Sequence, residues 1–325
     1  MTDAFNWHGG RIDAARSRFS VRGDDWIDLS TGINPVPWPH VKDVPWDWSA
    51  LPSLMALAEL ERVAAGYFGV DSANICALPG SEVGLRFLPA VLKVPGRHVA
   101  PTYRTHGAIF PQGVSDEIIG GKPSALLLAN PNNPDGQVRT AEEVRDLLRQ
   151  QQEANTWLIV DEAFADVLPT ISLAAEIDDE KRLILFRSFG KFFGLAGIRL
   201  GFVLGPARVI HEYRQLLGDW PVHSAGIAIA TAAYGDSCWI AQAREGLNAA
   251  SARLTELLRK HGFDPIGDCP LFTLIETEAA PHLFERLAHQ AILTRPFDYA
   301  PHWLRIGLPG DEPAWQRLDR GLSDG

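Results

Sequence analysis

Short apolar runs alternate with amphipathic segments through the middle of the chain, and this alternation restricts the possible folds more than any other feature. The apolar runs include SALLLANP, TWLIVDEAF, RLILFRS and IRLGFVLG, and the segments between them include AEEVRDLLRQQQ, whose apolar residues recur at helical spacing. Continuous apolar strands separated by helices are typical of a mainly parallel sheet that is covered on both faces. We therefore predict a large α/β domain over residues 50–215.

The regions on either side of this domain have different patterns. Residues 216–325 combine long helical patterns with two candidate strands, LFTLIET and HWLRIGL, and predict a smaller α+β domain. Proline and tryptophan are concentrated over residues 26–52, where each proline removes a backbone donor. We predict that residues 1–49 form an ordered arm that joins the small domain or wraps around another subunit. The tryptophans favour packing or a subunit contact, and a ligand-lining role is the alternative.

Composition disfavours several kinds of partner. The chain has 325 residues, with 30 Lys and Arg against 40 Asp and Glu, and its formal net charge of -10 repels nucleic acids. The three cysteines lack the spacing of a zinc site and fit a reducing, cytoplasmic location. No apolar run is long enough to span a bilayer, and the first residues do not resemble a signal peptide. We expect no metal, nucleic acid or membrane as a partner.

Two charged residues follow predicted strands, where open α/β sheets place their ligands. Asp161 comes directly after TWLIV, where its carboxylate can face a cationic ring nitrogen or cap the next turn. Lys191 lies three residues after Ser188, at the end of another strand, and two phenylalanines follow it. Apolar rings make a lysine amine lose its proton more easily, as imine formation requires. The alternative for Lys191 is a surface lysine beside a turn.

Other residues suit an anion. Gly80 and Ser81 form a glycine turn that opens a helix, where free backbone N–H groups can bind phosphate, although many such turns bind nothing. Arg199 can grip a phosphate with two donors or form a buried salt bridge. The segment NPNNPDG, residues 130–136, is a turn by composition and directly follows a predicted strand. None of these residues identifies a cofactor by itself.

The order of three segments resembles a known superfamily. NPNNPDG, then VDEAF, then SFGKFFGLAGIRLGF resembles the fold-type I pyridoxal-phosphate enzymes, specifically the class I/II aminotransferase superfamily, over nearly the whole chain. The resemblance implies a large domain with a mainly parallel seven-stranded sheet, a smaller α+β domain, pyridoxal 5'-phosphate as cofactor and a homodimer. It also implies that Lys191 forms the covalent imine with the cofactor and that Asp161 pairs with the pyridine nitrogen.

The resemblance assigns roles to further residues. It places Tyr103 on the face of the cofactor ring, Asn133 at the phenolate oxygen and Arg305 at the substrate carboxylate. Two positions depart from the pattern. Phe164 stands where many relatives have a tyrosine that donates to the phenolate, and Leu51 where many have a tyrosine that reaches the neighbouring subunit's cofactor phosphate. The residues expected to hold the cofactor phosphate are Gly80, Ser81, Ser188 and Arg199.

The N-terminal arm narrows the expected reaction. HGGRIDAA, followed by WIDLSTGINPVPWP, is similar to the start of the L-threonine O-3-phosphate decarboxylases of cobalamin biosynthesis. This similarity implies decarboxylation of that phosphorylated amino acid to (R)-1-aminopropan-2-yl phosphate. It also implies that His8 and Asn34, together with Asn133 and Arg305, bind the substrate. The structural alternative is that His8 caps a turn and Asn34 stabilises the proline-rich loop.

Two other functions remain possible at this level. A histidinol-phosphate aminotransferase would use the same residues, because the outcome depends on which bond at the substrate's Cα lies perpendicular to the cofactor ring. A non-catalytic regulator with the same fold is disfavoured by the presence of Lys191. The basic groups that would bind the substrate phosphate stay open, with His8, Arg11 and Arg295 as candidates.

Overall fold

The computed structural model describes residues 3–21, 26–114 and 123–323, and its contacts divide the chain into two compact units. Each unit combines segments that are distant in sequence. The large unit comprises Pro37–Asn133 and Val138–Arg244, and the small unit comprises Met1–Val36, Pro134–Gln137 and Glu245–Gly325.

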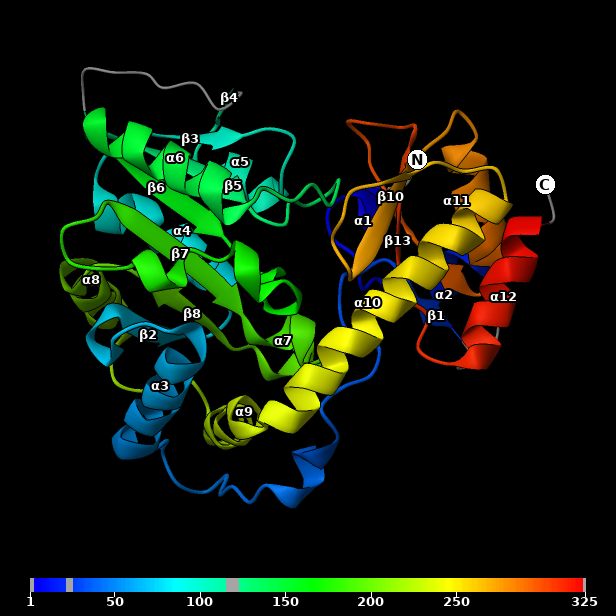
Figure 1. Cartoon of the computed structure of the whole chain (residues 1–325). Helices are drawn as coiled ribbons and strands as arrows, with labels where there is room; N and C mark the ends of the chain where they lie inside the picture. The colour runs from blue at the N-terminus through cyan, green and yellow to red at the C-terminus, as the bar shows by residue number, and fades with distance from the viewer. Residues whose placement is uncertain (1–2, 22–25, 115–122, 324–325) are drawn as a thin grey trace. The chain divides into compact units, whose positions relative to one another are not determined.

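The core of the large unit is a seven-stranded sheet (Figure 1). Its strand order is β2-β8-β7-β6-β5-β3-β4, and all neighbouring strands are parallel except those that pair with β8. This arrangement confirms the predicted α/β class and the mainly parallel sheet. The strands are β2 (Ile75–Leu78), β3 (Gly96–Val99), β4 (Gln112–Val114), β5 (Ser124–Ala129), β6 (Thr156–Asp161), β7 (Leu183–Ser188) and β8 (Gly201–Leu204).

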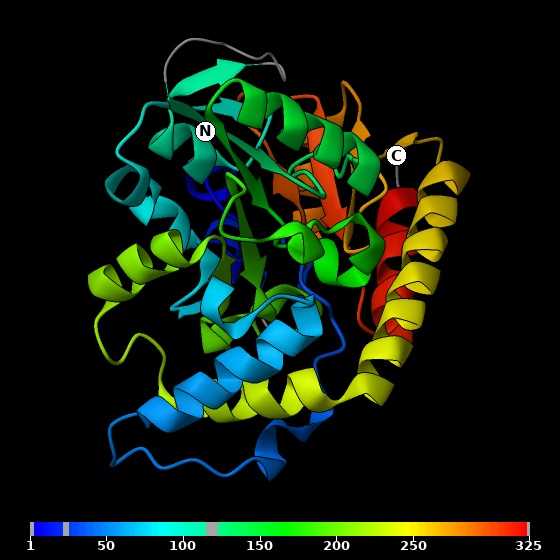
Figure 2. The same cartoon turned by 60° about the vertical axis from the view of Figure 1, so that its left-hand side comes forward.

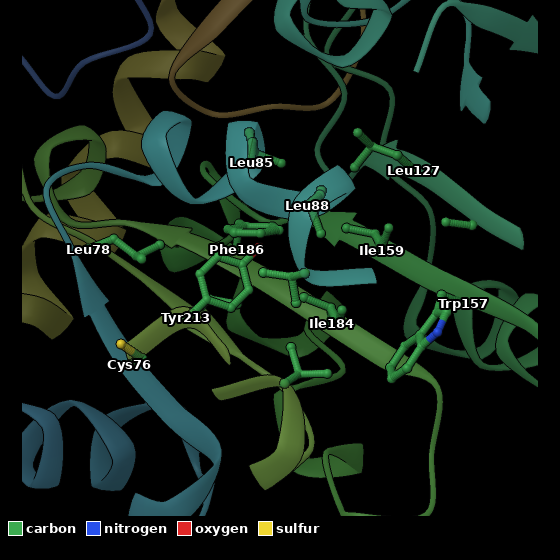
Figure 3. Close-up of a cluster of buried hydrophobic side chains, with 14 of the residues drawn as sticks. Cys76, Leu78, Leu85, Leu88, Leu127, Trp157, Ile159, Ile184, Phe186 and Tyr213 are labelled. Carbon is green, nitrogen blue, oxygen red and sulfur yellow. The ribbon is translucent and has the colours of Figure 1, made fainter. Parts of the chain in front are cut away.

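One face of this sheet is covered by α4 (Ser81–Leu92) and α8 (Ala207–Leu217). Side chains alternate between the two faces of a strand, so every second strand residue joins this layer. Tyr213 of α8 is fully buried and donates its hydroxyl to the Gly84 carbonyl of α4 at 2.9 Å. Figure 3 shows this cluster, which includes Leu85, Leu88, Leu127, Trp157, Ile159, Ile184 and Phe186.

The opposite face is covered by α3 (Leu54–Phe68), α6 (Ala141–Glu153) and α9 (Ser224–Gly235). The rings of Phe68 and Tyr234 each lie within 6 Å of the Phe202 ring of β8. Both views show α6 lying along the sheet beside β5 and β6 (Figures 1 and 2). The sheet is therefore buried on both faces, as its apolar strands require.

The large unit contains two segments that we expected in the arm and in the small domain, residues 37–49 and 216–244. Helical periodicity predicts a helix over residues 224–235 but does not say which sheet it covers. The structure shows that α9 packs against α3, where Tyr234 contacts Tyr67 with ring centroids 4.8 Å apart. Trp38 is held by its backbone N–H, which donates to the Phe193 carbonyl, and by its indole, which donates to Asp236.

Short helices occupy the connections of the large unit. Those nearest the candidate site are α5 (Arg104–Ile109) and α7 (Phe189–Phe192). The remaining ones are 3-10 turns: η1 (Pro39–Asp43), η2 (Ser72–Asn74), η3 (Ala165–Val167), η4 (Pro169–Ile171), η5 (Ala174–Glu176) and η6 (Ala196–Ile198). None of the helices within the described ranges is long and apolar enough to cross a membrane.

The small unit is built on an antiparallel sheet of order β12-β13-β10-β9. A parallel pair, β1 with β11, brings the N-terminal arm into this unit, because the Leu29 N–H also donates to the Leu293 carbonyl. Its strands are β1 (Ile27–Asp28), β9 (Pro265–Ile266), β10 (Phe272–Glu276), β11 (Ile292–Leu293), β12 (Arg295–Pro296) and β13 (Trp303–Gly307). Its helices are α1 (Asp3–Asn6), α2 (Ile12–Phe19), α11 (Ala280–His289), α12 (Glu312–Ser323) and the later part of α10 (Ser237–Lys260).

Candidate functional site

Asp161 ends β6 with its side chain almost fully buried. One carboxylate oxygen, Oδ1, accepts the backbone N–H of Ala163 at 3.1 Å, so the residue does cap the following turn. The other oxygen, Oδ2, lies 3.0 Å from Nε2 of His106. The capping and the functional alternatives are therefore compatible, because the two oxygens have different partners.

His106 is a member of the site that the sequence analysis did not single out. The residue lies on α5 and is fully buried. A carboxylate only accepts, so Nε2 donates to Asp161, while Nδ1 lies 2.9 Å from the Thr102 hydroxyl. A signal for this residue was present in PTYRTHG, because residues three apart on a helix share one face.

Tyr103 immediately precedes α5, and its ring meets the His106 ring edge-on with centroids 5.7 Å apart. Burial raises the pKa of the Tyr103 hydroxyl to about 12. The side chain is therefore a neutral aromatic surface throughout the physiological pH range, as stacking on a heteroaromatic ring requires.

Lys191 lies on α7, the short helix that begins directly after Ser188 at the end of β7. Its Nζ lies 5.7 Å from the centroid of the Phe164 ring. The lysine is half-buried rather than a solvated surface residue. Phe164, the position that departs from the tyrosine of many relatives, thus provides an apolar face beside the amine.

Gly80, Ser81 and Arg199 lie together at the start of α4. Gly80 has φ +94°, and a β-carbon there would come within 2.8 Å of Arg199 Nη2. Arg199 is exposed, and its Nη1 donates to the Ala196 carbonyl at 3.3 Å. It makes no ion pair with any residue in the described ranges, so the buried salt bridge considered as an alternative is not formed there.

The turn that contains Asn133 is fastened to β6. Asn130 exchanges two hydrogen bonds with the backbone of Arg139, at 2.9 and 3.0 Å, and its own N–H donates to the Asp161 carbonyl. Asn133 follows in this turn and is half-buried. These hydrogen bonds therefore fix the start of the turn, at Asn130, to the end of β6.

A buried charge network lies on the other face of the same strands. Arg187 of β7 pairs with Glu162 at 2.6 Å and with Asp166 at 2.5 Å, and all three side chains are buried. Ser172 donates to Glu162 at 2.6 Å, and the Arg187 guanidinium lies over the Phe68 ring at 4.6 Å. Burial raises the pKa of the Glu162 carboxyl, and the neighbouring guanidinium opposes that shift.

The residues of the large unit fit pyridoxal 5'-phosphate. The close approach of Arg199 to Gly80 brings a guanidinium to the start of α4, and a helix N-terminus beside a guanidinium suits a phosphate. Asp161 offers a buried carboxylate, Tyr103 a neutral ring, and Lys191 an amine beside an apolar face. No described group of His, Cys, Asp and Glu residues could hold a metal ion.

The remaining candidates lie in the small unit, where Arg305 of β13, Asn34 and Arg295 are all buried. Arg305 Nη2 donates to the Ser30 carbonyl at 2.9 Å, and its guanidinium lies over the Phe272 ring at 4.6 Å. Burial lowers the pKa of this guanidinium to about 10. Asn34 Oδ1 accepts the Val36 N–H at 2.9 Å, which is the loop-stabilising contact considered as an alternative.

The two sequence motifs of the arm touch each other in this unit. A β-carbon at Gly9 would lie 2.3 Å from the Ser30 carbonyl oxygen, and the Gly10 N–H donates to Ser30 Oγ at 2.8 Å. His8 is half-buried and its ring meets the Trp7 ring edge-on. The HGG segment therefore has a packing reason for its glycines, in addition to any role of His8.

The other basic candidates in this unit differ from each other. Arg295 donates to the carbonyls of Phe5 and Asn6 at 2.6 and 3.1 Å, so it fastens α1. Arg11 is exposed at the start of α2. Leu51, at the position expected for a tyrosine, belongs to the large unit and is largely exposed.

Comparison with known proteins identifies the family. The family model for aminotransferase class I and II matches residues 108–318. The chain belongs to the class I and II aminotransferase family. A threonine-phosphate decarboxylase from Pseudomonas aeruginosa is 40% identical to this chain, over 97% of this chain and 96% of the relative. A threonine-phosphate decarboxylase from a Sinorhizobium species is 37% identical, over 97% of each chain. The solved histidinol-phosphate aminotransferase of Sinorhizobium meliloti, in complex with pyridoxal-5'-phosphate, has TM-score 0.80 at 19% identity and covers 95% of this chain and 93% of its own.

Proposed function

We propose that the protein is a pyridoxal 5'-phosphate-dependent decarboxylase that converts L-threonine O-3-phosphate to (R)-1-aminopropan-2-yl phosphate and carbon dioxide, in cobalamin biosynthesis. The observation that carries the proposal is the identity of 37 and 40% with two threonine-phosphate decarboxylases over nearly the full length of all three chains. The alternative is an aminotransferase of the histidinol-phosphate type, and the solved structure of that type supports only the common fold.

The large unit would hold the cofactor. Arg199 with the start of α4 would bind its phosphate, Tyr103 would cover one face of its ring, and Asn133 would donate to its phenolate oxygen. Ser188, between β7 and α7, would add a hydroxyl to the phosphate site. When bound, pyridoxal phosphate supplies a protonated ring that accepts the electron pair of the bond broken at the substrate's Cα.

Asp161 and His106 would keep the ring nitrogen protonated. The Asp161 carboxylate would face that nitrogen, and an anion within hydrogen-bonding reach favours the protonated form. The 3.0 Å contact to His106 orients the carboxylate, and the turn at Ala163 fixes its other oxygen. The aspartate therefore needs no rearrangement when the ring arrives, which is the condition for electrostatic stabilisation.

Lys191 would bind the cofactor and then move a proton. When it is not bound to the cofactor, its Nζ would lie beside the Phe164 ring and would exchange a proton with the substrate's Cα. In decarboxylation it would deliver a proton to Cα after the carboxylate has left. In transamination it would instead remove the proton of Cα, so the same group serves both reactions.

Residues of the small unit would bind the substrate. Arg305 would clamp the carboxylate, and His8 and Asn34 would border the phosphate, while Asn133 is the candidate that the large unit supplies. The exposed apolar side chains of the large unit, among them Trp48, Leu51 and Met55, support a homodimer. The three free cysteines support a cytoplasmic location.

Product identification tests the proposal. The purified protein is incubated with pyridoxal phosphate and L-threonine O-3-phosphate, with and without 2-oxoglutarate, and the products are identified by mass spectrometry. We expect aminopropanol phosphate without the oxoacid. Consumption of the amino acid only with 2-oxoglutarate, together with formation of glutamate, would establish the aminotransferase instead. As a control, Lys191→Ala is expected to retain some cofactor and lose turnover in either case.

A further inference from the structure

His223 links the start of one helix to a turn of another segment. It lies immediately before α9, and its Nδ1 accepts the Gly226 N–H at 3.0 Å. Its Nε2 lies 2.8 Å from the Ile198 carbonyl oxygen. Because Nδ1 accepts from a backbone N–H, Nε2 carries the ring hydrogen and donates it to Ile198. Both nitrogens of the imidazole are thus engaged, each by a different backbone segment.

The turn that His223 contacts holds Arg199 in an unusual conformation. Arg199 directly follows Ile198 and has φ +55°, in the left-handed region that residues with a β-carbon seldom adopt. Such a conformation persists only where surrounding contacts fix it. The Ile198 carbonyl, which accepts from His223, belongs to the peptide unit that joins Ile198 to Arg199. The hydrogen bond therefore fixes the orientation of this peptide unit and, with it, the start of the Arg199 backbone.

The orientation of that turn decides where the guanidinium lies. Arg199 Nη2 would come within 2.8 Å of a β-carbon at Gly80, the residue that precedes α4. His223 is exposed, but a β-carbon at Gly226 would lie 3.1 Å from its Cε1 and 3.2 Å from the Ile198 side chain, so the three residues are close together. Trp48 stacks on the ring, with centroids 6.0 Å apart and planes at 24°.

We propose that His223 is a positioning residue for the cofactor phosphate: its Nε2–H holds the Ile198 carbonyl and thereby the left-handed turn that aims Arg199 at the start of α4. The inference rests on the proposed function, since it takes the phosphate of pyridoxal phosphate as the ligand of Arg199. His223 itself touches neither the phosphate nor the substrate. Its effect is transmitted through the backbone of residues 198 and 199.

Two isosteric substitutions separate the two hydrogen bonds of the ring. His223→Asn places an amide oxygen where Nδ1 stands, so it keeps the cap of α9 and loses the bond to Ile198. His223→Gln places an amide N–H near the position of Nε2, so it keeps the bond to Ile198 and loses the cap. The pair therefore tests the contact and not merely the presence of an imidazole.

The measurement is the dissociation constant of pyridoxal phosphate for the full-length protein after removal of the cofactor, with pyridoxal as a probe that lacks the phosphate. We expect His223→Asn to bind pyridoxal phosphate about 3- to 10-fold more weakly, the loss of one hydrogen bond. Its affinity for pyridoxal should be unchanged, and its melting temperature should fall no further than that of His223→Gln. His223→Gln should bind the cofactor nearly as the unchanged protein does and melt a few degrees lower.

A double-mutant cycle completes the test. If His223 acts through Arg199, then His223→Asn has no further effect on cofactor affinity in an Arg199→Ala protein. Equal weakening by the Asn and Gln variants, or loss of affinity for pyridoxal as well, would overturn the inference, and so would unchanged affinity in His223→Asn. Failure of the unchanged protein to bind pyridoxal phosphate would contradict the proposed function instead, so the two failures are distinguishable.

Discussion

Asp161 and Glu162 are adjacent carboxylates with opposite surroundings. Successive strand residues point to opposite faces of a sheet, so Asp161 faces α5 and Glu162 faces α3. Glu162 has an arginine, a serine hydroxyl and the Leu173 N–H as partners. Asp161 has a histidine and the Ala163 N–H, and no arginine or lysine contacts it among the described residues.

The end of β6 therefore contributes both to stability, through Glu162, and to the candidate site, through Asp161. The carboxylate of Glu162 is neutralised by Arg187 inside the fold, so it stabilises the ends of β6 and β7. The carboxylate of Asp161 is oriented without being neutralised by a permanent cation, so it can attract the positive charge of a ligand. Four substitutions test this difference between the two carboxylates and their surroundings.

The largest expected effect is on stability. Arg187→Met leaves Glu162 and Asp166 buried beside each other without their cation, which we expect to lower the free energy of unfolding by about 3–5 kcal/mol. Arg145→Met is the matched control, because Arg145 pairs with Glu176 at the surface, where such pairs contribute about 1 kcal/mol or less. Urea denaturation measures both. Equal midpoints for the two variants would show that the buried network does not hold the strand ends.

The next effect is on catalysis. Asp161→Asn keeps the shape of the side chain and removes the charge that would face the ring nitrogen. We expect kcat for decarboxylation to fall by about 10²- to 10³-fold, with little change in the urea midpoint. Glu162→Gln should show the reverse pattern, a lower midpoint with a smaller loss of kcat. If both variants lost activity and stability together, the two faces of β6 would not be functionally distinct.

A smaller effect is expected for the orienting histidine. His106→Phe keeps an aromatic ring in the buried position and removes the donor to Asp161. We expect kcat to fall by about 10- to 10²-fold, as for other residues that orient a reactive group through a hydrogen bond. The pH dependence of kcat should change as well, since the carboxylate loses a partner. An unaltered pH profile would mean that His106 serves packing alone.

The smallest effect concerns Phe164. Phe164→Tyr adds a hydroxyl beside Lys191, where many relatives have one. A donor to the phenolate favours its ionised form, so the pH midpoint of the bound cofactor's visible absorption change should fall by about one pH unit or less. Phe164→Leu, which adds no donor, should not lower that midpoint. A midpoint that rises in the tyrosine variant would place the hydroxyl away from the phenolate.

The sequence predicts the sheet of the large unit well because each strand is a continuous apolar run. It also places Asp161 at the end of one strand and Lys191 three residues after another, since each follows such a run. The spacing of His106 from Tyr103 pointed to this histidine. The sequence could not, however, reveal its contact with Asp161 or the Arg187 network, because these partners are 55 and 21 or more positions away and meet only through the sheet's register. Nor could helical periodicity assign residues 224–235 to the large unit, since it shows that a face is buried but not against what.

Asn34 illustrates a further limit. Its motif suggested a substrate contact, and the structure shows a hydrogen bond to Val36 two residues away. A short-range amide bond of this kind is available to any asparagine in a loop. The substrate contact of Asn34 therefore stays a prediction beside this loop-stabilising bond.

The pairing of β1 with β11 has a consequence for how the chain folds as it is synthesised. Arg295 follows Phe5 by 290 positions, and Ile27 is paired with Ile292, so residues 5–29 gain these partners only after residues 292–295 have left the ribosome. All strands of the large sheet lie between Ile75 and Leu204 and are complete earlier. Until then the buried residues Phe19 and Leu29 lack these partners, and apolar surface that is exposed during folding is prone to aggregate. This segment is thus synthesised before the large sheet but paired after it.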